Sequence, residues 1–252
     1  MFEIYSIPPE SWNEGINNPF LLRNFGEASK SEGKVVYLQD GKNKAIIIIK
    51  KKLINIFSRA QIFTNSYESS FLKEIYDYLK NKGIPYLRIG NNMDGPHNVE
   101  PNLNFNLIKR NTFSIDLRTS LDELWKNFDK KLRNAIRKAE KGGIIVQELK
   151  SEDDLKKYYA LSLETEREIR QKKGRKSFSL QGYSFFYEIF KNNGGKFFLA
   201  RAKDEIIAGA LFLVACDKSI YFHSCLSRTY ADKQAPSLIQ WEAIKEFRKI
   251  GL

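Results

Sequence analysis

The chain has 252 residues, 42% of them hydrophobic and 13% aromatic, which is enough for one large domain or two of ordinary size. Its formal net charge of +12 favours an anionic partner such as a nucleic acid, a nucleotide or a membrane surface. The two cysteines exclude a disulfide framework and a cysteine-rich zinc cluster, and they suit a reducing, cytoplasmic location. The start of the chain has no signal-peptide pattern, and the longest apolar run, Ala45 to Ile49, is too short to span a membrane.

The first half of the chain predicts a small sheet with helices. Asp40-Gly41 is the strongest hairpin signal, because this pair favours a tight turn between two strands. The elements expected here are a strand at 3–6, helical pieces within 11–25, strands at 34–39, 44–50 and 51–57, a helix at 66–82, a strand at 84–89 and a loop at 91–104.

The second half predicts another group of strands and helices. The elements expected are a strand at 112–117, a helix at 121–141, a strand at 144–149, helices at 151–171 and 181–192, strands at 196–202, 205–215 and 219–227, and a helix at 236–249. The fold class is therefore α/β (α+β), with mixed, mostly antiparallel sheets flanked by helices. Two domains are expected, at 1–111 and 112–252.

The helix expected at 121–141 has two unlike sides. Apolar residues recur at spacings of three and four, while lysines and arginines gather opposite them. Thr119 or Ser120 can cap its start, and Gly142 and Gly143 are typical of its end. An ordinary surface helix with a solvated basic side explains this pattern, and so does a platform for phosphates. The candidate phosphate ligands are Lys130, Arg133, Arg137 and Lys138.

The last expected strand and the loop after it carry the other candidates. Period two places Tyr221, His223, Cys225 and Ser227 on one side of the strand. Neighbours on one strand are poorly placed for a catalytic Cys/His pair, so we expect Tyr221 and His223 to line a pocket. The loop at 227–236 then opens a helix, whose first N–H groups can bind an anion. Its candidate ligands are Arg228, Tyr230 and Lys233, and no metal site or nucleophile motif is expected.

Two separated blocks resemble a known family. The first is TFSIDL at 112–117 followed by LDELWKNFDKKLRNAIRKAEKGG, with the core KLRNAIRKA at 131–139. The second is YFHSCLSRTYADKQAPSLIQWEAIKEFRKIG at 221–251, with QWEAI at 240–244. These blocks are similar to those of the FemABX family of peptidoglycan-bridge aminoacyltransferases, and PYLRIG at 85–90 also fits.

The resemblance implies two tandem GNAT-like domains and an aminoacyltransferase. The family moves an aminoacyl group from aminoacyl-tRNA to an amine on a nucleotide- or lipid-linked cell-wall precursor. The partners would be aminoacyl-tRNA and an anionic acceptor, with association at a membrane surface allowed, and no cofactor is implied. The basic helix and the 227–236 loop would then converge beside one cleft.

Two other functions stay open at this point. One is a coenzyme-A-dependent N-acetyltransferase on the same fold, although the 227–236 loop lacks the glycine pattern that holds the coenzyme A pyrophosphate. The other is a basic RNA-binding protein without catalysis, which the small number of acids, bases and nucleophiles allows.

Overall fold

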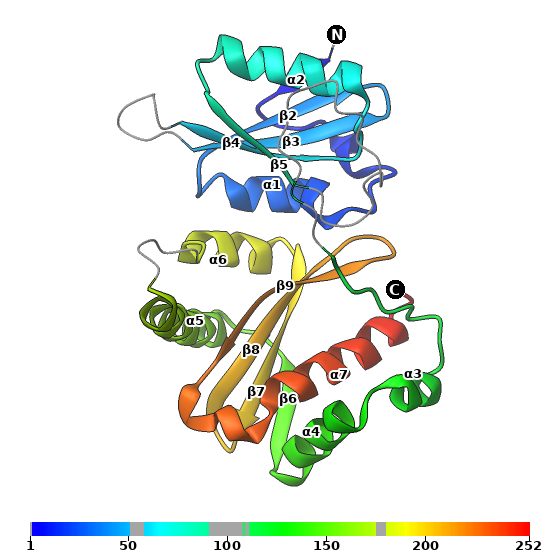
Figure 1. Cartoon of the computed structure of the whole chain (residues 1–252), viewed down its shortest axis with the longest axis vertical. Helices are drawn as coiled ribbons and strands as arrows, with labels where there is room; N and C mark the ends of the chain where they lie inside the picture. The colour runs from blue at the N-terminus through cyan, green and yellow to red at the C-terminus, as the bar shows by residue number, and fades with distance from the viewer. Residues whose placement is uncertain (1, 51–57, 91–107, 109–110, 175–179) are drawn as a thin grey trace. The chain divides into compact units, whose positions relative to one another are not determined.

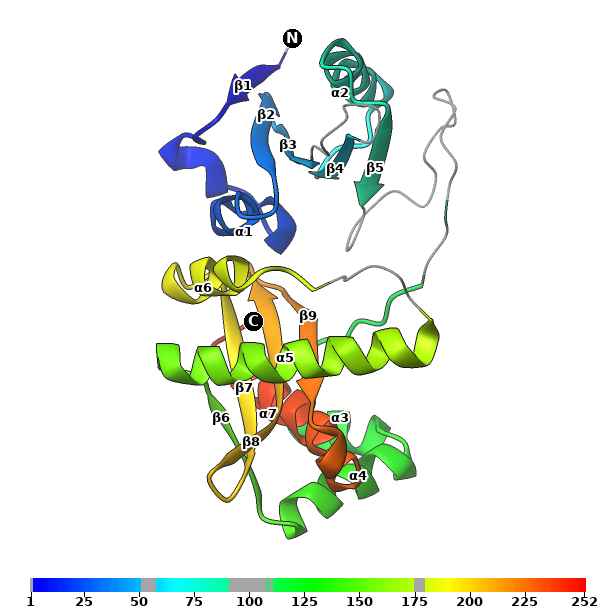
Figure 2. The same ribbon diagram turned by 90° about the vertical axis from the view of Figure 1, so that its left-hand side faces the viewer.

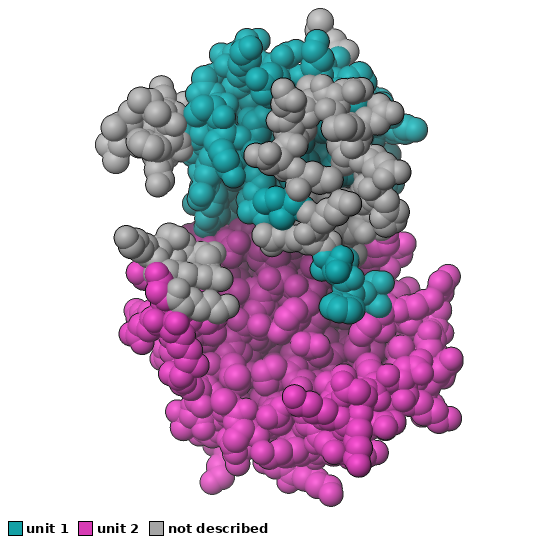
Figure 3. Space-filling model, viewed as in Figure 1, with its two compact units in different colours: residues 1–114 teal, residues 115–252 magenta. Residues whose placement is uncertain are grey.

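A computed structural model describes residues 2–50, 58–90, 108, 111–174 and 180–252. By backbone proximity the chain divides into unit 1, Met1–Ser114, and unit 2, Ile115–Leu252 (Figure 3). Each unit has its own sheet, and each is described by itself.

Unit 1 is built on a five-stranded sheet with the order β1-β2-β3-β4-β5 (Figure 1). Neighbouring strands are antiparallel, except that β4 and β5 are parallel and the chain between them contains α2. The elements are β1 (Glu3–Tyr5), η1 (Glu10–Asn13), η2 (Pro19–Leu21), α1 (Arg23–Ser29), β2 (Lys34–Asp40), β3 (Asn43–Lys50), β4 (Arg59–Thr64), α2 (Ser69–Asn81) and β5 (Tyr86–Gly90).

Both sides of this sheet are covered, which explains the apolar run in β3. One side packs against α2, where Ile47 and Ile49 meet Phe71 and Ile75 in one buried cluster. The other side lies against η2 and α1, and Figure 2 shows α1 and α2 on opposite sides. A strand that is buried on both sides needs no polar alternation.

Unit 2 is built on a four-stranded antiparallel sheet with the order β6-β7-β8-β9. Helices α5 and α6 lie on one side of it, and α7 lies on the other side with α4 packed against it (Figures 1 and 2). The elements are α3 (Leu121–Asn127), α4 (Lys130–Lys141), β6 (Ile144–Glu148), α5 (Glu152–Lys173), α6 (Tyr183–Lys191), β7 (Gly195–Ala202), β8 (Glu205–Val214), β9 (Ser219–Leu226), η4 (Arg228–Lys233) and α7 (Ala235–Lys249).

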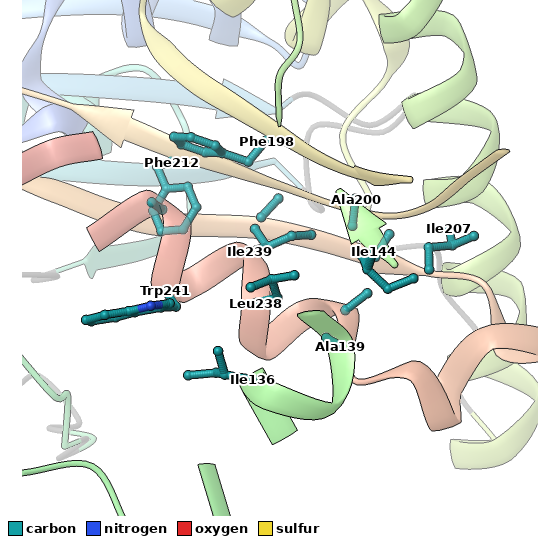
Figure 4. Close-up of a cluster of buried hydrophobic side chains, with 14 of the residues drawn as sticks. Ile136, Ala139, Ile144, Phe198, Ala200, Ile207, Phe212, Leu238, Ile239 and Trp241 are labelled. Atoms are coloured by element: carbon teal, nitrogen blue, oxygen red, sulfur yellow. The ribbon is translucent and has the colours of Figure 1, made fainter. Parts of the chain in front are cut away.

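The core between α4, α7 and the sheet holds the basic helix in place. Ile136 and Ala139 of α4 are buried against Leu238 and Trp241 of α7 (Figure 4). Phe198 of the sheet belongs to the same cluster. This apolar contact fixes one side of α4 and turns its cations outward.

The predicted continuous helix at 121–141 is wrong, because the structure divides it into α3 and α4. Phe128 and Asp129 have extended backbones, with ψ angles of 142° and 160°. The Phe128 ring packs against Trp241, 5.5 Å between centroids. The Asp129 carboxylate accepts a hydrogen bond from Leu132 N at 2.6 Å and caps the start of α4. Ser120 caps α3 in the same way.

The other expectations have mixed outcomes. The strand predicted at 112–117 is wrong, since these residues form neither helix nor strand. The strand predicted at 51–57 lies outside the described residues, as does the loop predicted at 91–104. Strand β4 was not predicted. The predicted class, mixed and mostly antiparallel sheets flanked by helices, is confirmed.

None of the helices in the described residues is both long and apolar enough to cross a membrane.

Candidate functional site

Helix α4 presents a row of cations to solvent. Lys130, Lys131, Arg137, Lys138 and Lys141 are exposed, and Arg133 is half-buried. Within the described residues, none of these six side chains pairs with a carboxylate. An exposed cation without a partner keeps its hydration and can exchange it for a phosphate.

The two arginines of this row are held against α3. The Arg133 Nη1 atom donates to the Lys126 carbonyl at 3.5 Å. The Arg137 guanidinium lies over the Trp125 ring, 5.4 Å from its centroid, and Trp125 in turn packs on Trp241 at 5.3 Å. A guanidinium stacked on an aromatic ring keeps its N–H edges free for a planar oxyanion. The break at Phe128-Asp129 thus positions the two arginines, because it lets the Lys126 carbonyl and the Trp125 ring of α3 reach them.

The segment that opens α7 contains Arg228, Tyr230 and Lys233. Arg228 Nε lies 3.9 Å from the Glu168 carboxylate of α5, while the Tyr230 hydroxyl donates to Glu205 at 2.7 Å. Lys233 is half-buried. The N-cap of α7 is Gln234, with a left-handed backbone at φ 60° and no side-chain cap. Pro236 has no N–H, and Ser237 N donates to the Gln234 carbonyl at 3.1 Å, so few N–H groups are available at this helix start. Anion binding there stays a prediction.

The two candidate residues of strand β9, Tyr221 and His223, lie on opposite sides of the sheet. A β-bulge shifts the register between β8 and β9, so that Leu211 pairs with His223 but Phe212 pairs with Tyr221. The Tyr221 ring packs on Phe212, in the core under α7, at 5.2 Å. His223 instead meets the helices on the opposite side of the sheet. The prediction that Tyr221 and His223 share one side is therefore wrong, because the bulge adds one residue to β9.

His223 is paired and kept neutral. Its Nδ1 atom lies 2.6 Å from the Tyr158 hydroxyl of α5, and its ring packs on Phe186 of α6 at 5.2 Å. Burial lowers the pKa of His223 to about 4, and the nearby charge of Glu166 opposes this shift. With this pKa, the imidazole is uncharged near neutral pH and offers no positive charge to an anion.

Cys225, two residues further along β9, is no better suited to covalent chemistry. The side chain is buried, and burial raises the pKa of the thiol to about 12. A thiol that stays protonated is a poor nucleophile.

Tyr158 was missed by the sequence reasoning, although one signal pointed to it. Gly209 interrupts the apolar strand β8, and a Cβ atom there would lie 2.6 Å from the Tyr158 ring. An isolated glycine within a strand often marks such a close approach.

The nine predicted residues line neither of the two surface cavities described, one in each unit. The four on α4 lie on the α7 side of the sheet, whereas His223 and Arg228 contact α5 on the other side. Tyr230 packs against the cluster shared by α4 and α7. The convergence of the basic helix and the 227–236 loop beside one cleft stays a prediction. Among the described residues, no group of three His, Cys, Asp or Glu side chains could hold a metal ion.

Comparison with known proteins identifies the chain's relatives. The chain resembles the solved structure titled "Crystal structure of FemX", with a TM-score of 0.69, 15% identity, and coverage of 99% of this chain and 86% of that one. A conserved protein of unknown function from Bacteroides thetaiotaomicron VPI-5482 matches with a TM-score of 0.61, 11% identity, and coverage of 98% and 86%.

At these identities, the structural likenesses show the fold alone. A search of curated protein sequences gave no significant match. The model of the FemAB family, however, matches residues 61–203, which is more than half of the sequence. The chain therefore belongs to the FemAB family.

Proposed function

We propose that this protein transfers an aminoacyl group from aminoacyl-tRNA to an amine of a phosphate-bearing, nucleotide- or lipid-linked precursor of cell-wall type. Membership of the FemAB family supports an acyltransferase activity. The single observation that carries the choice of donor is the row of unpaired cations on α4.

The length of this row favours a polyanion over a single nucleotide. Lys130, Arg133, Arg137 and Lys141 follow one another at spacings of three and four residues, so they lie along one side of α4. At about 1.5 Å per residue, the row extends roughly 16 Å. A nucleic-acid strand in a helix carries one phosphate per about 3.4 Å of axis, so several phosphates match this length. A pyrophosphate would occupy only part of it.

The chemistry that we propose needs no enzyme nucleophile. The amine nitrogen of the acceptor attacks the carbonyl carbon of the aminoacyl ester, and an amide bond forms. The bond from that carbon to the ribose oxygen of the tRNA breaks, and the proton lost by the amine ends on the ribose hydroxyl. Positioning the two substrates and stabilising the oxyanion intermediate would supply the catalysis. The buried, protonated Cys225 and the neutral, hydrogen-bonded His223 are consistent with direct transfer.

The decisive experiment offers labelled aminoacyl-tRNA and acetyl-CoA separately, each with a panel of amine acceptors. We expect transfer from aminoacyl-tRNA only. Transfer from acetyl-CoA alone would overturn the proposal in favour of a coenzyme-A-dependent acetyltransferase. Steep, salt-dependent tRNA binding without turnover would favour a non-catalytic RNA-binding protein.

A further inference from the structure

Unit 1 contains a surface cavity that the proposed reaction does not use. Its volume is about 900 Å³, which is within the range of small-molecule sites. It lies where the turn between β2 and β3, the segment after η1 and the start of α2 come together. Its polar lining includes Glu14, Lys42, Lys44, Tyr67 and Glu68.

Lys44 is a charged side chain buried at this cavity. Only 7% of the residue is exposed. Its Nζ atom donates to the carbonyl oxygens of Trp12 at 2.6 Å and Glu14 at 3.1 Å, and it lies 5.5 Å from the centre of the Trp12 ring. An ammonium group has three N–H bonds, so one donor remains beyond the two carbonyls.

The charge of Lys44 is not neutralised by the surrounding protein. Among the described residues, no carboxylate lies within ion-pair distance of its Nζ atom. Desolvation lowers the pKa of Lys44, and the charge of Glu14 only partly opposes this effect. Carbonyl dipoles solvate a cation but leave its charge in place, and a buried charge without a counterion is costly. An anion in the cavity would remove this cost.

A second group at the cavity also lacks a partner. The hydroxyl oxygen of Tyr67 is buried and makes no hydrogen bond within the described residues. Burial raises the pKa of Tyr67 to about 12, so the group remains a donor at neutral pH. Unpaired buried hydroxyls are rare in native proteins and point to a missing partner.

The start of α2 supplies further donors beside Tyr67. Its N-cap, Glu68, makes no side-chain bond to the first turn. The Glu68 carboxylate accepts from the Asn43 amide at 3.2 Å instead. The backbone N–H of Ser69, a cavity residue, is therefore left for an acceptor in the cavity.

We propose that this cavity of unit 1 binds a small-molecule oxyanion, a phosphate or carboxylate group, through Lys44, the Tyr67 hydroxyl and the first N–H groups of α2. The two lysines of the lining are matched by Glu14 and Glu68, so the cavity carries no net positive charge. A nucleic-acid strand would be repelled by these carboxylates, whereas one compact oxyanion can reach the donors between them. The site is thus chemically different from the basic row of α4.

Inorganic phosphate is the probe that tests this site. Phosphate is titrated into the full-length protein at constant ionic strength with chloride as the compensating anion, and amide NMR spectra locate the binding. We expect saturable shifts of the Ser69 and Ser70 amides, together with a rise in Tm. Lys44→Met should weaken this binding by about tenfold, and Tyr67→Phe by about threefold, because each removes one donor while keeping the shape.

Lys42→Met is the matched control, because Lys42 is an exposed lysine of the same lining. Its affinity should stay within about twofold of the wild type. Shifts confined to α4, or an unchanged affinity in Tyr67→Phe and Lys44→Met, would overturn the proposal. If Lys44→Met does not fold, the wild-type spectra and Tyr67→Phe decide the question. Neither result depends on aminoacyl transfer, so this site and the proposed function can fail separately.

Discussion

The two sides of the unit 2 sheet hold their polar groups in opposite ways. On the α7 side, the cations of α4 stand on the outside of an apolar core and have no carboxylate partner among the described residues. On the α5 side, Tyr158 is buried and His223 is half-buried, and the two are hydrogen-bonded to each other. Exposed charges are available to a ligand and contribute little to folding, whereas buried polar groups are already paired and stabilise the fold. Substitutions on the first side should change binding, and those on the second should change stability.

The largest expected effect is the loss of stability at acidic pH that His223 causes. Its pKa is about 4 in the folded protein and about 6.5 when unfolded, so the unfolded chain binds more protons between these values. The contribution of His223 to stability is full above pH 6.5 and falls as the pH decreases towards 4, by up to about 3 kcal/mol. Urea unfolding of the wild type and of His223→Gln, each at pH 7.5 and pH 4.5, measures this change in the free energy of unfolding.

The two proteins should differ in the pH dependence of their unfolding free energies, with a smaller loss in His223→Gln. Equal losses in both would show that His223 is not the half-buried, neutral group that the structure indicates.

The next effect is steric and concerns Gly209. Alanine there would place a methyl group 2.6 Å from the ring of Tyr158, which is fully buried and cannot move aside. We expect Gly209→Ala to reduce the unfolding free energy by about 2 kcal/mol, as overpacking does in other cores. Thermal unfolding measures the change. Gly90→Ala is the control, because its added methyl group would lie 3.6 Å from the nearest atom, which is an ordinary van der Waals contact. A similar loss in both variants would contradict the close approach.

On the other side of the sheet, substitution of the arginines of α4 should weaken tRNA binding without lowering the stability of the fold. We expect the double variant Arg133→Ala/Arg137→Ala to bind tRNA about tenfold more weakly. The slope of the logarithm of the affinity against the logarithm of the salt concentration should become shallower by about two, one for each lost phosphate contact. Its Tm should change little, because neither arginine pairs with a carboxylate among the described residues. Filter binding over a series of salt concentrations measures both quantities.

The matched control for this experiment replaces two cations of unit 1, as Lys73→Ala/Lys80→Ala on α2. An equal loss of tRNA affinity in that control would mean that net charge, and not the row on α4, determines binding. Unfolding of the arginine variant would instead assign those residues a structural role.

The smallest effect concerns the start of α4. Asp129→Ala removes the carboxylate that caps Leu132 N, and we expect a loss of about 1 kcal/mol in stability. Asp129→Asn keeps an oxygen that can cap the helix and should restore most of the loss. If Asp129→Asn is as unstable as Asp129→Ala, the charge of Asp129 and not its cap is responsible.

Local chemistry was sufficient for much of the fold. Asp40-Gly41 predicted the turn between β2 and β3, where Gly41 has a φ of 56°. The two glycines after Lys141 predicted the end of α4, and Gly143 has a φ of 71°. The apolar and basic sides of α4 followed from residue spacing, because a helix repeats every 3.6 residues wherever it lies. These features depend on residues close together in the sequence.

Contacts between distant residues decided the rest. Helix α3 ends at Asn127, and the ring of the next residue, Phe128, packs against Trp241, more than a hundred positions further along the chain. The bulge in β9 depends on its pairing with β8, and it separates Tyr221 from His223. Lys44, at the start of β3, is buried because Trp12 of η1 lies against it.

The sequence by itself therefore determined many of the helices and strands, the basic side of α4 and the two sequence blocks that resemble the family. The tertiary structure alone decided which polar groups are exposed and which are buried. The physical reason is that helix period and turn geometry act over a few residues, whereas burial depends on which distant segments pack together.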